Sequence, residues 1–159
     1  MRTTEYQLMQ NPALGSLCLW AFIHRYCSGP GRSAGVPMAL MPCVLPVTFH
    51  RETVDLLRRR RFDGGLLNAL ADDQSFPAGI QQRMEDMLPQ TLDSLNLGFA
   101  ARLFASDGTT FRLTPIVRSR PVFSETQLHR DMLATAERLA HWFVVYPTGQ
   151  VASYLQLSI

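Results

Sequence analysis

The sequence predicts a mostly helical α+β fold: a winged-helix-like domain with a central buried N-terminal helix and one β-hairpin. Three observations support this class. Residues 13–27 are apolar almost all round, as in a helix that other helices surround. Apolar residues between positions 88 and 99 recur at helical spacing. Two strand-like runs follow directly in residues 102–114, and a helix that leads into a hairpin is the layout of a winged-helix domain.

The first helix is expected to begin at Asn11, because Asn caps helices well and Pro12 fits the first helical position. It should end before the glycine-rich residues 29–35, which predict a flexible loop.

Residues 36–49 form an apolar stretch that has to be buried. Pro37, Pro42 and Pro46 interrupt it, and proline lacks the N–H that a helix interior needs. We therefore expect this stretch to be extended or in short turns.

The middle of the chain predicts a helix over residues 50–61 and a short helix over residues 66–71. A longer helix begins near Pro77, and Pro89 either kinks it or opens a second helix. The residues expected to face the core from this region are Ile80, Met84, Met87, Leu88, Leu92, Leu95 and Phe99.

A two-residue turn at Asp107-Gly108 predicts the hairpin, with strands over residues 102–106 and 109–114. Asp-Gly is favoured there because both central residues need φ > 0, which Gly accepts freely and Asp tolerates. One face of the hairpin should then carry an aromatic cross-strand pair. In this register Phe104 lies opposite Phe111, and Arg102 lies opposite Leu113.

The last long helix is expected to begin with a capping box made by Ser124 and Gln127. Pro147 ends it, and residues 151–159 form an apolar tail, predicted as one helical turn and a strand. The core face of this helix is expected to consist of Leu128, Met132, Ala136, Leu139 and Phe143.

The composition fits an ordinary globular protein. A length of 159 residues suits one domain, with a helical half over about residues 1–75 and a helix-hairpin-helix half over about residues 76–159. A hydrophobic content of 47% with 18% charged residues provides a core and excludes a disordered chain. The net charge of +2 is too small to indicate nucleic-acid binding by itself.

The cysteines and the hydropathy pattern bear on the compartment. Cys18, Cys27 and Cys43 are odd in number and follow no framework spacing, so we expect free thiols that pack as small hydrophobes in a reducing compartment. No apolar run is long and unbroken enough for a membrane span, and the polar N-terminus argues against a cleaved signal peptide. We expect a cytoplasmic protein with no membrane contact.

The residues give no indication of an enzyme. The four histidines lack metal-ligand spacing, and a Walker loop needs a Lys, which the chain lacks. No GxSxG nucleophile motif is present. We therefore expect no catalytic residues, no metal and no cofactor.

The run Arg58, Arg59, Arg60 and Arg61 is the most marked charge cluster, and two interpretations of it stay open. Cations in the last turn of a helix complement its dipole, which contributes roughly 0.3–1 kcal/mol. Alternatively, the cluster binds an acidic partner surface or a nucleic-acid backbone. Consecutive helical residues point around most of the helix, so the four cannot all serve one ligand.

Trp142 and Tyr146 flank the core face of the last helix and are candidates to anchor a partner. Residues 13–27 and 36–49 together hold more apolar surface than a chain of this size comfortably covers. We therefore expect part of the surface to be buried by another chain.

Four segments carry a family resemblance: residues 11–29, 42–59, 97–115 and 136–159. Together they resemble the middle component of three-component ABC systems, bacterial conflict systems of the Lamassu type. The chain departs from this resemblance in its last four residues, where we expect a Gly- and Pro-containing end. The resemblance implies a small non-catalytic adaptor subunit beside an SMC-like ABC ATPase and an effector, often a nuclease, in defence against phage or plasmid DNA. Contact with DNA is then expected through the complex.

Two other functions compete with the adaptor. A winged-helix transcriptional regulator would need a basic recognition helix, but residues 89–98 contain Asp93 and no Arg. A small enzyme would need a site assembled from distant residues, and nothing in the sequence favours one.

Overall fold

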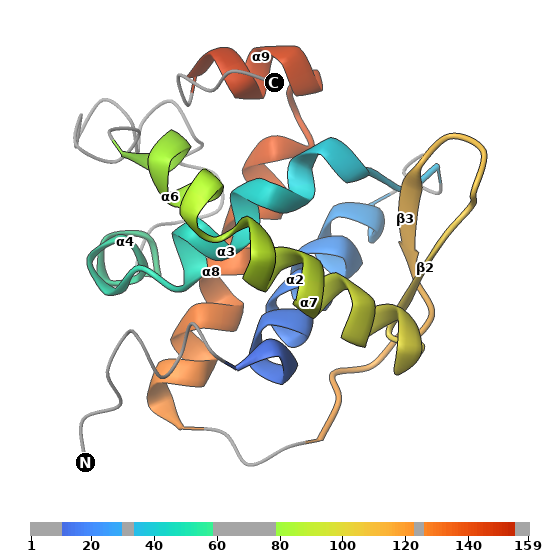
Figure 1. Ribbon diagram of the computed structural model, residues 1–159, viewed down its shortest axis with the longest axis horizontal. Helices are drawn as coiled ribbons and strands as arrows, with labels where there is room; N and C mark the ends of the chain where they lie inside the picture. The colour runs from blue at the N-terminus through green and yellow to red at the C-terminus, as the bar shows by residue number, and fades with distance from the viewer. Residues whose placement is uncertain (1–10, 30–33, 59–78, 123–125, 155–159) are drawn as a thin grey trace.

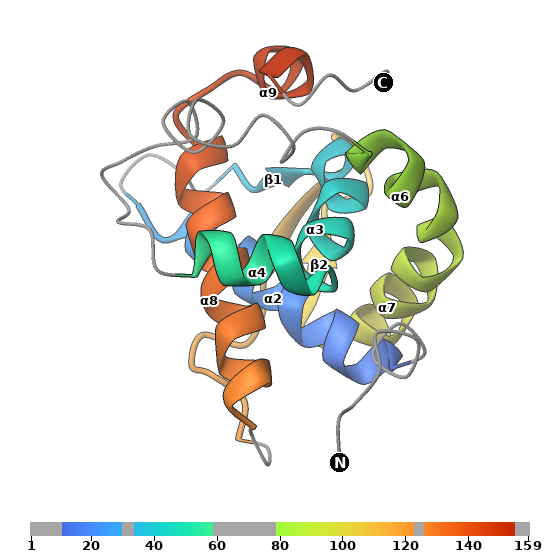
Figure 2. The same ribbon diagram turned by 90° about the vertical axis from the view of Figure 1, so that its left-hand side faces the viewer.

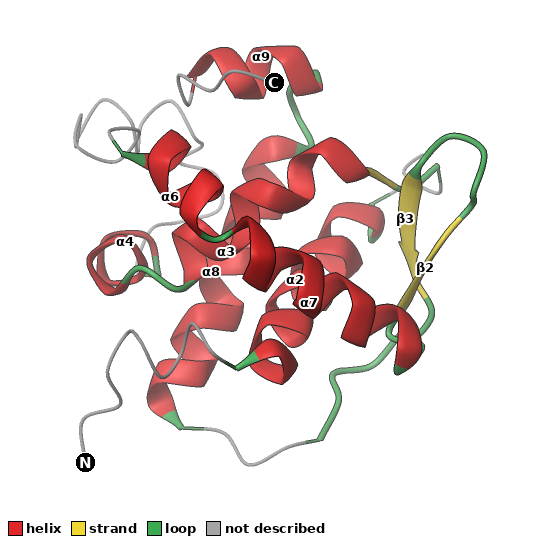
Figure 3. Ribbon diagram, in the orientation of Figure 1, coloured by secondary structure: helices red, strands yellow, loops and turns green. Residues whose placement is uncertain are grey.

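The computed structural model describes residues 11–29, 34–58, 79–122 and 126–154. Helices make up most of these residues, and three short strands form an antiparallel sheet at one side of the molecule (Figures 1 and 3). The predicted mostly helical α+β class is confirmed, while the winged-helix assignment stays a prediction. The helices and strands are α2 (Pro12–Cys27), β1 (Val36–Pro37), the 3-10 turn η1 (Met38–Leu40), α3 (Met41–Thr48), α4 (Arg51–Leu57), α6 (Ile80–Asp86), α7 (Leu88–Ala100), β2 (Phe104–Ser106), β3 (Arg112–Pro115), α8 (Gln127–Phe143) and α9 (Thr148–Tyr154).

Helix α2 is the central element, as the sequence predicts. The Asn11 side chain caps it by accepting a hydrogen bond from the backbone N–H of Leu14 at 3.1 Å. From Leu14 to Ile23 every residue is buried except Leu17, which is half-buried. Helices α3, α7 and α8 and strand β3 all pack against α2 (Figures 1 and 2). A helix without a polar face is stable here because its neighbours cover it on several sides.

The expectation for residues 36–49 is wrong in conformation and right in burial. Only Val36–Pro37 is a strand, and residues 41–48 form helix α3. Pro42 lies in the first turn of α3, where no intrahelical donor is needed. Pro46 lies inside the helix, at the loss of one backbone hydrogen bond. Burial of almost every side chain of α3 outweighs that loss.

Pro89 opens a second helix rather than kinking the first. Helix α6 ends at Asp86, and Pro89 occupies the first turn of α7. Ile80, Met84 and Met87 face the core as predicted.

The predicted core face of α7 is wrong for Leu88 and Leu92, which are 43% and 51% exposed. The buried face consists of Leu95 and three small residues, Thr91, Ser94 and Gly98. The reason is the close approach of neighbouring elements. Helix α2 packs directly on Ser94 and the Phe104 ring lies over Gly98, so larger side chains do not fit at these two positions.

The predicted hairpin is present, but its register differs. Strand β2 pairs with β3 so that Phe104 lies opposite Pro115 and Ser106 lies opposite Leu113. The predicted pairs Phe104 with Phe111 and Arg102 with Leu113 are therefore wrong. The Asp107 carboxylate accepts hydrogen bonds from the backbone N–H groups of residues 109 and 110, and this local turn replaces the two-residue turn with a five-residue loop over 107–111.

Strand β1 joins the hairpin and makes the sheet three-stranded, in the order β1-β3-β2. Val36 lies opposite Leu113, and both are fully buried. The sheet thereby connects the segment after α2 to residues near position 113.

Helix α4 begins one residue later than predicted, because His50 is its N-cap and accepts a hydrogen bond from the Thr53 N–H. It ends at Leu57, and the predicted residues 59–61 and the helix over 66–71 lie outside the described residues.

Helix α8 begins with a different capping box from the predicted one. Thr126 is the N-cap, its hydroxyl accepts from the His129 N–H, and the His129 ring accepts from the Thr126 N–H. Ser124 lies outside the described residues. Pro147 separates α8 from α9, and residues 155–159 of the predicted tail also lie outside the described residues.

Candidate functional site

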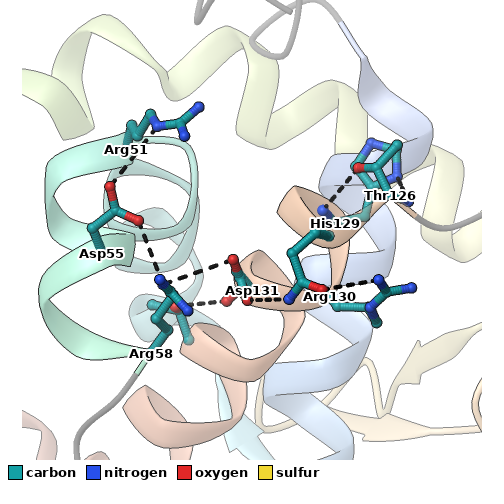
Figure 4. A network of polar contacts seen from close by, with 9 residues as sticks. Arg51, Asp55, Arg58, Thr126, His129, Arg130 and Asp131 are labelled. Atoms are coloured by element: carbon teal, nitrogen blue, oxygen red, sulfur yellow. Dashed lines mark hydrogen bonds and ion pairs between the residues drawn. The ribbon is translucent and has the colours of Figure 1, made fainter. Parts of the chain in front are cut away.

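Arg58 is the member of the arginine cluster that the structure describes, and it belongs to an internal ion-pair network (Figure 4). Its Nε atom lies 3.4 Å from an Asp55 carboxylate oxygen and 3.7 Å from an Asp131 oxygen. The Arg51 Nε atom lies 3.8 Å from the other Asp55 oxygen. The network connects α4 to α8, with the Arg58 side chain 25% exposed and the Asp131 side chain 19% exposed.

Asp131 is also held by its own helix. Gln127 donates a hydrogen bond to its carboxylate at 2.9 Å, and the Thr135 hydroxyl donates to its backbone carbonyl. A partly shielded pair with additional hydrogen bonds is worth more than an exposed one, because water screens it less. Arg58 is therefore used to join two helices. The role predicted for Arg59, Arg60 and Arg61 concerns residues outside the described part and stays a prediction.

Trp142 lies in the core and not at the surface, where the predicted partner contact requires it. Its side chain is 1% exposed and belongs to the core, so it is not at the surface to anchor a partner in this structure. Spacing along α8 places it beside the core face, but α2 and α4 also pack on this helix and widen the buried arc. Tyr146 is half-buried and packs against the core cluster, and its partner role stays a prediction.

All four histidines have structural contacts. His24 stacks on Trp20 with the ring centres 4.9 Å apart, and His141 lies 3.4 Å from the Arg25 guanidinium. His50 and His129 cap α4 and α8. Within the described residues no three His, Cys, Asp or Glu side chains group as metal ligands.

All three cysteines carry free thiols. Burial raises the pKa of Cys18 and of Cys43 to about 12, and it also raises the pKa of the half-buried Cys27. A thiol that stays protonated at neutral pH is a poor nucleophile, so these cysteines act as packing groups.

The exposed side of α7 is the feature that the sequence analysis missed. Seven residues of the helix are exposed, and five of them are apolar. Asp93 is the single charged residue of α7, and Glu85 and Asp86 at the end of α6 add two carboxylates nearby in the chain. The sequence signal for this arrangement is the row of small residues at positions 91, 94 and 98, which marks the side of α7 that neighbouring elements approach closely. The apolar residues of this surface, here called the α7 face, are Leu88, Pro89, Leu92, Leu97 and Ala100.

No helix within the described residues has the length and apolar character that crossing a membrane requires. A family model described as ABC-three component (ABC-3C) system Middle Component 3 matches residues 1–158. No curated protein and no solved structure matches the chain. The match covers nearly the whole chain and agrees with the resemblance of its four segments.

Proposed function

The chain belongs to the Middle Component 3 family of ABC-three component systems, and on that premise we propose that it is a non-catalytic adaptor or regulatory subunit. It would connect an SMC-like ABC ATPase of the Lamassu type to an effector, often a nuclease. The complex would act in defence against phage or plasmid DNA, and the subunit would work in the cytoplasm.

The α7 face is the observation that supports an adaptor most directly. Leu88, Leu92 and Leu97 are between 37% and 51% exposed on a helix that is fixed from behind by α2. Leucines on a rigid element can bury apolar area against a partner without first being ordered. The carboxylates of Asp93, Glu85 and Asp86 favour a partner surface that is apolar and bordered by basic side chains.

The same helix argues against a winged-helix transcriptional regulator. In that fold the helix before the hairpin reads the major groove and needs basic or amide side chains directed at the bases. Helix α7 has Asp93 as its single charged residue, and its exposed side is mostly apolar. A negatively charged, leucine-rich helix is poorly suited to a polyanion and well suited to a protein surface.

Co-expression with the ATPase and the effector of the same system tests the proposal. The tagged subunit should co-elute with at least one of them in size-exclusion chromatography. The double substitution L88S/L92S should abolish co-elution while leaving the circular-dichroism melting curve unchanged. The matched control is V145S, at an apolar residue that is 61% exposed after the end of α8, and it should co-elute normally.

Two results would contradict the proposal. One is a well-behaved monomer that co-elutes with neither component. The other is ATP turnover or DNA cleavage by the purified subunit that a single substitution in this chain abolishes.

A further inference from the structure

The exposed side chains of helix α7 form two parallel rows along the helix. Within each row the residues are four positions apart, and such rows are the ridges by which helices pack on one another. One row consists of Leu88, Leu92, Asn96 and Ala100, and the other consists of Pro89, Asp93 and Leu97.

The opposite side of α7 holds these rows in place. Leu95 is buried in the core, Ser94 lies directly against α2, and the Phe104 ring lies over Gly98. Figure 2 shows α6 and α7 along one edge of the molecule, with α3 on their inner side. A partner therefore meets a preformed surface, and leucines on a rigid helix lose little entropy on binding.

The rows indicate the kind of element that fits this surface. The backbone groups of α7 are bonded within the helix, so the surface has no free sheet edge to which an extended peptide could add. Ridges instead fit into the grooves between the side-chain rows of a second helix. With 13 residues α7 is about 20 Å long, which gives a second helix roughly three to four turns of contact.

The charge of the surface indicates what this second helix carries. Residues 79–101 contain three carboxylates, Glu85, Asp86 and Asp93, and all three are exposed. Arg83 is the single basic residue of this range, and it is half-buried. A helix with arginine or lysine beside its apolar stripe is the complementary partner, whereas the phosphates of a nucleic acid are repelled.

Asp93 lies near the middle of α7, where a crossing helix makes its closest contact. Among the described residues no cation lies within ion-pair distance of its carboxylate. A second copy of this chain is a poor match for the surface. A two-fold axis through the middle of α7 would bring the two Asp93 carboxylates together, and like charges at an interface oppose binding.

We infer that the α7 face binds an amphipathic helix of another component of the same system, with the leucines of α7 against its apolar stripe and an arginine or lysine of that helix paired with Asp93. The inference rests on the proposed function, because that function requires a partner at this face. It adds the structural element and the charge that the partner presents.

Substitution of Asp93 tests the charge. In titrations of the purified proteins at low salt, D93N should weaken binding to the co-expressed partner component by several-fold and D93K by about tenfold or more. The difference from wild type should shrink as salt is added, because salt screens the pair. Both variants should melt at the wild-type temperature, since Asp93 is exposed. E52Q is the matched control, at an exposed carboxylate in the first turn of α4, and it should bind normally.

Photo-crosslinking tests the helix. The probe p-benzoylphenylalanine is incorporated at Asn96 or Ala100, in the same row as Leu92, and mass spectrometry identifies the partner residues that it reaches. These residues should lie in one segment of the partner, three or four positions apart, as on one side of a helix. The same probe at Val145, which is 61% exposed after the end of α8, should leave that segment unlabelled.

Each outcome decides the inference. Cross-links scattered over several partner segments, or cross-links between two copies of this chain, overturn it. Equal binding by wild type and D93N at low salt also overturns it, and if L88S/L92S still abolishes binding, the proposed function stands without it. A wild-type chain that binds no component removes both. If D93K lowers the melting temperature, D93N and the cross-links decide instead.

Discussion

Gly15 of α2 lies against Ser94 of α7 so closely that a Cβ atom on Gly15 would be 2.1 Å from the Ser94 hydroxyl oxygen and 3.0 Å from its Cβ. This contact sets the distance between the two helices, and the small residues around Ser94 fill the narrow space.

We therefore expect G15A to lower the free energy of unfolding by about 1–2 kcal/mol, because overpacking outweighs the better helix propensity of alanine. Urea denaturation measures this change. The double variant G15A/S94A should recover most of the loss, since it removes the closest atom. G149A is the matched control, because a Cβ atom there meets nothing within 4 Å, and a loss of similar size at Gly149 would contradict the explanation.

Arg58 forms an ion pair with Asp131 that joins the end of α4 to α8. We expect D131A to lower the free energy of unfolding by about 1–3 kcal/mol, because it leaves the partly shielded Arg58 without this carboxylate and removes the acceptor for Gln127. D55A, at a side chain that is 54% exposed, should cost less than about 1 kcal/mol.

The triple variant R59Q/R60Q/R61Q tests the predicted partner role without disturbing the network of Arg58. Stability should be unchanged, while affinity for the partner complex or for DNA should fall and the remaining affinity should depend less on salt. Unchanged assembly and unchanged DNA affinity at moderate salt would leave the helix-dipole interpretation for these residues.

Substitutions at two leucines three positions apart on α7 should have very different effects on the free energy of unfolding. L95A should lower the free energy of unfolding by about 2–4 kcal/mol, because Leu95 is buried in the core. L92A should change it by less than about 0.5 kcal/mol, since Leu92 is half exposed. Equal losses at both sites in thermal or urea melts would show that α7 is rotated relative to this structure.

The thiols should differ in reactivity. At pH 8 a thiol reagent should label at most Cys27 in the folded protein, because Cys18 and Cys43 are buried. All three should react in urea, and C27S should abolish labelling of the folded state. Fast labelling of a second thiol in the absence of denaturant would contradict the burial of Cys18 and Cys43.

The same burial predicts a loss of stability at high pH. The pKa of Cys18 is about 12 in the folded state against an ordinary value of 9.0, so the unfolded chain releases this proton first as the pH rises. The free energy of unfolding should therefore be highest below pH 9 and should fall between about pH 9 and pH 12, by up to ~1.4 kcal/mol per pH unit for each such thiol. C18A should show a smaller fall, which pH-dependent urea titrations can measure.

Sequence reasoning succeeded where one physical effect dominated. A helix that is apolar on nearly all sides, as α2 is, is stable only when other elements surround it. The Asn11 cap follows from local hydrogen bonding. It failed where tertiary packing competed with local preference. Pro46 argues against a helix, but the burial of α3 decides otherwise. Leucine periodicity in α7 indicates a helix without indicating which side is buried, because that depends on Gly15, far away in the sequence.

The surfaces were the hardest to predict. The arginine run is conspicuous in the sequence, yet Arg58 forms ion pairs with carboxylates of two helices. One of these carboxylates, Asp131, is 73 positions away in the sequence, so the sequence does not reveal the pair. The helical pattern places Trp142 at the edge of the core face of α8, whereas the structure buries it. A pattern in the sequence cannot show how many neighbouring helices pack on α8. The sequence alone does not identify the α7 face, because its position follows from the packing of the small residues of α7 against α2.

The central place of α2 also has a consequence for synthesis of the protein. Its main covering helices, α7 and α8, lie about 60 to 130 residues further along the chain. At a translation rate of roughly 5–20 residues per second, this largely apolar helix leaves the ribosome several seconds before α7 and α8 have been synthesised. During that interval the nascent chain exposes a long apolar segment, so the protein should depend on chaperones while it is being made rather than after it has folded.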